Sequence, residues 1–177
     1  MKKAITLLLI IIFTAGAVYA LVYFMKMDGF AFAWALNFLL MFCVLAFTET
    51  LKSPLASAYY TAKPWERRGK IYEAAGINLY RKLLVWTGWE KLNKKNAPVV
   101  KGTGALAHLH YQTKKSELGH LIILVIVLGF TVYVAMEYGV LKSVPLMILN
   151  ILLNLYPVFL QRYNRPRIER AIRLSQR

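Results

Sequence analysis

The stretch NLYPVFLQRYNRPR, from Asn154 to Arg167, is the one around which this chain is organised. It begins inside an apolar run and leaves that run through a dense group of polar and basic side chains. If a helix continues through it, helical spacing places four polar residues near one face: Asn150, Asn154, Gln161 and Arg165. Amides buried in hydrocarbon are costly without partners, so this face should meet protein or a wet cavity. Three guanidinium groups, at Arg162, Arg165 and Arg167, then offer forked donors that suit phosphate or carboxylate.

The composition indicates an integral membrane protein. The chain has 177 residues, of which 58% are hydrophobic, and its formal net charge is +15. High apolar content together with strong positive charge suits a small membrane protein whose basic face meets anionic lipid headgroups. Apolar runs of this length argue against a nucleic-acid partner. A single cysteine, Cys43, excludes an intramolecular disulfide and a thiolate metal cluster.

Four apolar runs are long enough to cross a bilayer, at about residues 4–25, 30–47, 118–136 and 140–160. We therefore predict an all-α fold, a four-transmembrane-helix bundle forming one membrane domain over residues 1–177. The first run could also be a cleavable signal peptide, but it is longer than a usual signal core, and we expect an uncleaved span. Short turns are expected at Met25–Gly29 and Glu137–Gly139.

The long segment from 48 to 117 is of mixed composition. Pro64 is expected at the first position of a helix. Beyond it, apolar residues recur at four-residue steps, at Ile71, Ala75, Leu79 and Leu83. Gly76 should divide this pattern into two short amphipathic helices lying in the headgroup plane, although solvated helices packed on the protein's own spans remain an alternative. Residues 93–103 are expected to form a loop.

The positive charges predict the orientation in the membrane. Of the 23 Lys and Arg residues, two precede the first span, thirteen lie in residues 48–117 and six follow Leu160. Only Lys26 and Lys142 fall on the opposite side. By the positive-inside rule, both termini, the long loop and the basic tail at 161–177 are cytoplasmic.

Glu117 and His120 are the strongest candidates for chemistry. They lie three residues apart, hence on one helical face, and the hairpin of the last two spans should bring His120 level with Phe159 to Arg162. A histidine oriented by a carboxylate can act as general base on a hydroxyl group. In the alternative, Glu117 pairs with a tail arginine and His120 caps the same network without chemistry. A metal site using this pair with His108 and His110 would need more acidic residues, so we predict no metal.

Three blocks of the sequence resemble a known family: TKKSELGH at 113–120, NLYP at 154–157 with QRYNRPR at 161–167, and WERRGKIY at 65–72. They are similar to the glycosyl-4,4'-diaponeurosporenoate acyltransferases, from about residue 62 to the C-terminus. The resemblance implies a bacterial-type cell membrane enzyme that esterifies a sugar hydroxyl of a glycosylated carotenoid acid with a fatty acyl group, late in staphyloxanthin-type pigment synthesis. One difference is Gln112, where a Glu is expected.

The resemblance implies that Glu117 and His120 are catalytic and that the substrates bind at a polar set made of Arg162, Arg165, Arg167, Asn164, Gln161, Tyr163, Asn154, Lys70 and Glu66. It also implies a fatty acyl donor such as acyl-CoA as co-substrate, without another cofactor. The expected partners are membrane lipids, a lipid-like acceptor, and another copy of the chain or other enzymes of the pathway.

Two other functions stay open from the sequence. With four spans in 177 residues, the chain has little room for a separate catalytic domain, so it could be a non-catalytic lipid-binding or assembly subunit of a biosynthetic complex. A small lipid-moving transporter is the third hypothesis, supported only by Asn150 and Asn154 in the last span.

Overall fold

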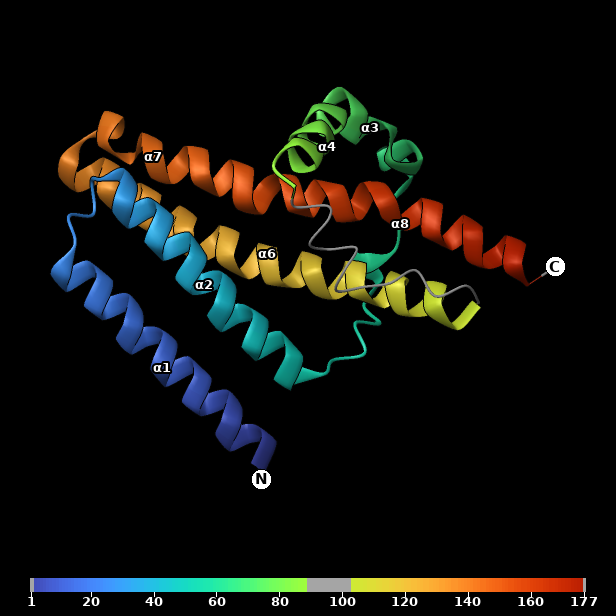
Figure 1. The fold of residues 1–177 in the computed structure, drawn as a ribbon, viewed down its shortest axis with the longest axis horizontal. Helices are drawn as coiled ribbons and strands as arrows, with labels where there is room; N and C mark the ends of the chain where they lie inside the picture. Colours follow the sequence, from blue (N-terminus) through green and yellow to red (C-terminus); the bar gives the residue numbers. More distant parts are fainter. Residues whose placement is uncertain (1, 89–102, 177) are drawn as a thin grey trace. The chain divides into compact units, whose positions relative to one another are not determined.

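The computed structural model describes residues 2–88 and 103–176, and the regular elements in these residues are all helices. Four helices are long and apolar enough to cross a membrane (Figure 1): α1 (Lys2–Phe24), α2 (Phe30–Leu51), α6 (Thr103–Tyr138), and the helix Val140–Ser175. The last of these consists of α7 (Val140–Asn150), a π-helical segment (Ile151–Leu155) and α8 (Tyr156–Ser175). This confirms the predicted all-α, multi-pass membrane fold.

The helices extend further than the apolar runs. α6 begins at Thr103, ahead of the predicted span at 118–136, and the residues that follow Thr103 include many good helix formers and no proline. The rest of the expected 93–103 loop lies outside the described residues. At 36 residues, α6 is about 54 Å long, well beyond the hydrocarbon core of about 30 Å. α8 is helical through the basic tail.

The chain divides into two compact units, and unit 1 comprises Met1–Pro54 and Leu118–Pro157. One face of α2 contributes to its core at the four-residue steps Phe32, Leu36, Leu40 and Val44. These side chains share one buried cluster with residues of α6 and α7, namely Ile123, Val127, Val134 and Leu146. In a bilayer such contacts stabilise through close packing, since lipid tails are as apolar as the side chains themselves.

Helix α1 is apolar on all sides and has no buried residue. It packs beside α2, to which it is joined by the turn predicted at Met25–Gly29 (Figure 1). Asp28 in this turn accepts a salt bridge from Lys142 at 3.2 Å. The second predicted turn is also present, because α6 ends at Tyr138 and Gly139 adopts a φ of 93° before α7 begins.

Unit 2 comprises Leu55–Glu117 and Val158–Arg177. It contains short 3₁₀ helices at Ala58–Tyr60 and Pro64–Gly69, then α3 (Lys70–Ala74) and α4 (Ile77–Trp86), which lie along α8 (Figure 1). As predicted, Pro64 opens a helix and Gly76, with a φ of 82°, separates the two amphipathic helices. Tyr72 packs against Phe159 with ring centroids 5.3 Å apart.

Candidate functional site

A buried cluster of two carboxylates and two guanidinium groups lies in unit 2. Glu117, at the C-terminal end of the α6 portion of this unit, has no exposed surface. One of its carboxylate oxygens accepts a hydrogen bond from Arg162 Nε at 2.6 Å, and the other accepts one from Arg165 Nη2. Burial of a charge is tolerated when its partners are this close, and loss of one partner then becomes costly.

Both arginines are fully engaged by the protein. Arg162 also donates to Glu66 at 2.8 Å and to the Tyr59 carbonyl at 3.1 Å. Arg165 also donates to the Tyr60 carbonyl at 3.1 Å and to the Thr113 hydroxyl. Each guanidinium nitrogen donates to an acceptor within the protein, so the cluster ties the segment at 59–66 to α6 and α8.

Glu66 is the second carboxylate of the cluster and is 3% exposed. It accepts hydrogen bonds from the Tyr72 hydroxyl at 2.6 Å, from Arg162, and from the Lys63 backbone N–H at 2.6 Å. Burial alone would raise the pKa of Glu66, but these hydrogen bonds outweigh it and lower the pKa below its ordinary value. Burial and the neighbouring Glu66 raise the pKa of Tyr72, so this phenol stays protonated and donates.

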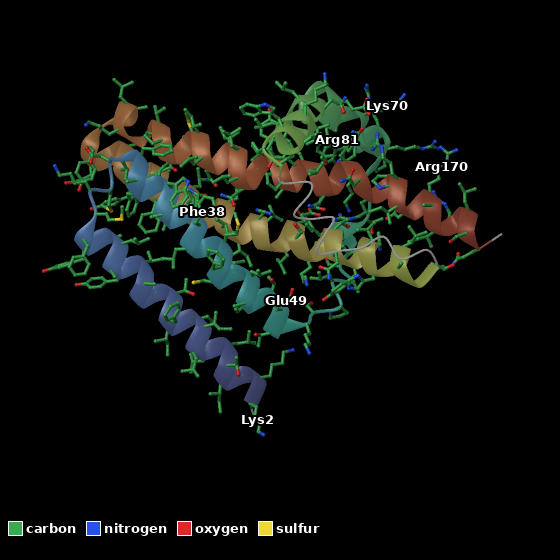
Figure 2. The ribbon with its side chains drawn as sticks, in the orientation of Figure 1. Lys2, Phe38, Glu49, Lys70, Arg81 and Arg170 are labelled. Atoms are coloured by element: carbon green, nitrogen blue, oxygen red, sulfur yellow. The ribbon has the colours of Figure 1, made fainter. Side chains whose placement is uncertain are left out.

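The other predicted residues of the tail lie around Tyr163, a buried residue of α8. The Arg167 guanidinium stacks over the Tyr163 ring at 3.5 Å and donates to Glu73 at 3.1 Å. Gln161 and Asn164 are half-buried. Figure 2 shows Lys70 and Arg81, both exposed, on the two short helices of the same unit.

A chain of buried amides lies in unit 1 and leads to His120. Asn154 Nδ2 donates to Asn37 Oδ1 at 2.8 Å and to Asn150 Oδ1 at 2.9 Å. The Asn154 side-chain oxygen faces Nδ1 of the half-buried His120 at 3.5 Å. Asn37 and Asn150 are anchored in turn on backbone carbonyls, those of Ala33 at 2.8 Å and Leu124 at 3.1 Å.

These anchors determine the direction of every amide. A backbone carbonyl can only accept, so Asn37 and Asn150 must present their NH₂ groups to Ala33 and Leu124 and their oxygens to Asn154. Asn154 must therefore turn its NH₂ group toward both oxygens, which leaves its own oxygen for the imidazole. With Nδ1–H as the donor to this oxygen, the neutral ring carries its lone pair on Nε2.

Local irregularity of the last helix helps to hold this arrangement. Pro157 has no N–H, so the usual partner of the Leu153 carbonyl is missing. The helix responds with the π-helical segment Ile151–Leu155, which contains Asn154, and the imidazole of His120 hydrogen bonds with the Leu153 backbone. Segments of this kind occur often at functional sites.

Some predicted site residues thus contact one another in the structure, whereas Glu117 and His120 have different hydrogen-bond partners. Glu117 is joined with Arg162, Arg165 and Glu66, whereas the described partners of His120 are Asn154 and Leu153. Sequence reasoning did not identify the contributions of Asn37, Tyr59, Tyr60, Tyr72 and Thr113. Of these, only Asn37 carried a signal, since a lone amide in a membrane span is a functional candidate by itself.

The remaining histidines make local contacts. His110 meets Glu169 at 3.2 Å, and His108 meets Gln112 at 3.2 Å. Over residues 2–88 and 103–176, no three His, Cys, Asp or Glu side chains gather closely enough to hold a metal ion.

Comparison with known proteins adds one finding. A family model described as glycosyl-4,4'-diaponeurosporenoate acyltransferase matches residues 56–174. This range contains both carboxylates of the cluster, His120 and the whole arginine-rich tail motif. No curated protein and no solved structure matches the chain significantly.

Proposed function

Because the chain belongs to the glycosyl-4,4'-diaponeurosporenoate acyltransferase family, we propose that it esterifies a sugar hydroxyl of a glycosylated carotenoid acid with a fatty acyl group, and that His120 is the general base. The single observation that supports this role is the amide chain ending at His120. It orients the ring and leaves the lone pair on Nε2, the nitrogen that can accept a proton from a hydroxyl group.

In the proposed reaction, His120 Nε2 takes the proton of the sugar hydroxyl as its oxygen attacks the acyl carbonyl of the donor. A new C–O bond forms, the bond to the leaving group breaks, and the imidazolium returns the proton to that group. For an acyl-CoA donor the leaving group is a thiol. No further cofactor takes part in this proposal.

Glu117 has a positioning role in the proposed mechanism. Its carboxylate holds Arg162 and Arg165, which in turn hold the backbone carbonyls of Tyr59 and Tyr60. The cluster therefore acts through the shape of unit 2 and not through proton transfer. The cytoplasmic placement of both termini belongs to the same proposal and is supported by the thirteen Lys and Arg residues in positions 48–117.

Mass spectrometry of lipids tests the proposal in a host that makes the glycosylated carotenoid acid. We expect a species heavier by one fatty acyl group with the wild type and with His108→Ala, which removes an exposed histidine from the same helix. His120→Ala should abolish that species while the protein remains in the membrane at the same level. Full product from His120→Ala would remove His120 from the mechanism. No product from the wild type would favour the non-catalytic subunit.

A further inference from the structure

We propose that unit 2 binds the phosphate groups of an acyl donor at an exposed basic surface, formed by Arg67, Arg68, Lys70, Arg81 and Arg167. This inference rests on the proposed acyl transfer but concerns a different group of residues from the buried cluster. Arg162 and Arg165, two of the arginines expected from the sequence to meet an anion, are buried and paired with Glu66 and Glu117.

Two of these arginines lie in a strained left-handed turn, and both are exposed. Arg67 (φ 47°, ψ 46°) and Arg68 (φ 56°, ψ 33°) are both left-handed, and Gly69 follows at φ 91°. Side-chain-bearing residues adopt this conformation only where the surroundings impose it, and such strain clusters at functional sites. Here the buried Glu66 on one side and the tightly packed Gly69 on the other hold the turn, and both guanidinium groups are exposed.

Gly69 brings this turn directly against α8. A Cβ atom at Gly69 would lie 3.1 Å from Arg167 Nη1 and 3.2 Å from the Tyr163 carbonyl oxygen. Only a glycine permits so close an approach at this φ. The approach brings the backbone that carries the exposed basic residues 67, 68 and 70 against the guanidinium of Arg167.

The Tyr163 ring joins Arg81 to the same group. The Arg167 guanidinium lies 3.5 Å from the centre of this buried ring, and the Arg81 guanidinium lies 5.6 Å from it. Both cations are held by the ring face, which restrains them without neutralising their charge. The basic surface is therefore partly preorganised.

Among the described residues, carboxylates do not balance the charge of this surface. In the described part of the chain, the one carboxylate paired with any of the five residues is Glu73, which bonds Arg167. Five positive charges and one negative charge leave a formal excess of +4. In the buried cluster, by contrast, Glu66 and Glu117 balance Arg162 and Arg165. An excess of this size, presented largely on guanidinium forks, suits a multiply charged phosphate.

Exposed apolar side chains come from the same short helices. Trp65, Leu79 and Trp86 are 58%, 74% and 85% exposed. Basic residues and exposed apolar side chains on the same short helices suit a molecule with a phosphate end and a fatty chain. Both an acyl-CoA donor and an anionic lipid headgroup carry phosphate, so the experiment must distinguish these two ligands.

The test uses the full-length protein in nanodiscs of zwitterionic phosphatidylcholine, with coenzyme A as the first probe in equilibrium dialysis. The test variant is Arg67→Asn/Arg68→Asn, because asparagine tolerates the left-handed conformation. The matched control is Arg170→Gln/Arg173→Gln, which removes two exposed arginines from α8 (Arg170 in Figure 2). We expect at least about tenfold weaker coenzyme A binding in the test variant and less than about twofold change in the control.

The second arm measures the phosphate source. Nanodiscs with and without phosphatidylglycerol are compared for their effect on coenzyme A binding and on thermal stability. Loss of the phosphatidylglycerol effect alone in the test variant would assign the surface to a lipid headgroup. Equal behaviour of test and control variants toward both probes would overturn the proposal. If Arg67→Asn/Arg68→Asn does not fold, Lys70→Gln/Arg81→Gln carries the same test.

The test of the basic surface can fail or succeed independently of the test of the proposed acyl transfer. His120→Ala should bind coenzyme A like the wild type even though it makes no product. If no variant affects binding while acyl transfer is observed, the basic surface fails and the function stands. If binding depends on Arg67 and Arg68 but no acylated lipid forms, the surface stands and the function fails.

Discussion

Glu117 and Arg162 are 45 positions apart in the chain, yet the arginine Nε lies 2.6 Å from the glutamate oxygen. This pair joins the two chain segments of unit 2, Leu55–Glu117 and Val158–Arg177. One precedes the last two spans in the sequence and the other follows them. Because Arg162 also reaches Glu66, a single guanidinium binds two separate parts of the Leu55–Glu117 segment to α8. Stability and site geometry in unit 2 therefore depend on few contacts, and substitutions can test them one at a time.

Glu117→Gln should lower the free energy of unfolding by about 3–5 kcal/mol, because it leaves the buried Arg165 without a negative partner and Arg162 with Glu66 alone. Thermal unfolding in detergent, followed by circular dichroism, measures this loss. The matched control is Glu73→Gln, whose carboxylate is 39% exposed and pairs with the exposed Arg167. It should cost less than about 1 kcal/mol. Equal losses in the two variants would contradict the account of the buried cluster.

Asn37→Leu should reduce turnover without removing any residue of α6 or α8. The substitution leaves an Asn154 N–H without its acceptor, at a cost of about 1–3 kcal/mol, and loosens the orientation of His120. We expect a lower kcat with little change in KM, measured with detergent-solubilised enzyme. The control is Thr131→Val, since the buried Thr131 hydroxyl bonds only the Val127 carbonyl of its own helix among the contacts described. Unchanged kcat in Asn37→Leu would argue against an orienting amide chain.

Gly69→Ala and Gly88→Ala separate backbone strain from close packing. Both glycines have positive φ, 91° and 76°, so alanine costs about 1–2 kcal/mol of conformational energy at either site. At Gly69 the new methyl group would also meet Arg167 and the Tyr163 backbone, whereas at Gly88 no described residue lies within 4 Å. Thermal unfolding should show the larger loss for Gly69→Ala. Equal losses would mean that the turn is not pressed against α8.

The lowered pKa of Glu66 predicts an acid-dependent loss of stability. The folded-state pKa lies below the unfolded value of about 4.3, so the stabilisation is complete above that pH and disappears as the pH falls through the folded pKa. Between pH 5 and 8 this group should contribute no pH dependence. Unfolding temperatures measured from pH 3 to 7 for the wild type and Glu66→Gln test this. The variant should lose less stability than the wild type on acidification, and parallel curves would contradict the prediction.

Much of the architecture could be predicted because its causes are local. A bilayer requires long apolar helices, and Gly76 could be identified as a helix boundary because positive φ favours glycine. The polar stripe of the last span was also predicted to need partners, and Asn150 and Asn154 do have them. Their partners could not be identified from spacing, since Asn37 is 117 positions from Asn154.

The buried cluster was harder to predict for a different reason. Arginine-rich sequence is equally suited to an outside anion and to carboxylates of the same chain. Which one it meets depends on where Glu66 falls, and that depends on the left-handed turn at Arg67 and Arg68. Neighbouring arginines are not typical of such a turn, so the sequence contains no local signal for it.

The amide chain makes the orientation of His120 depend on a residue outside the matched family segment. The matched family segment begins at residue 56, but the chain of amides that orients His120 starts at Asn37 on α2. Residues 56–174 produced alone would therefore lack one acceptor for Asn154, and a separately expressed fragment carrying the α1–α2 hairpin should restore it by complementation. Variation confined to that hairpin could accordingly adjust the orientation of His120, the proposed base, without altering any residue of the matched segment.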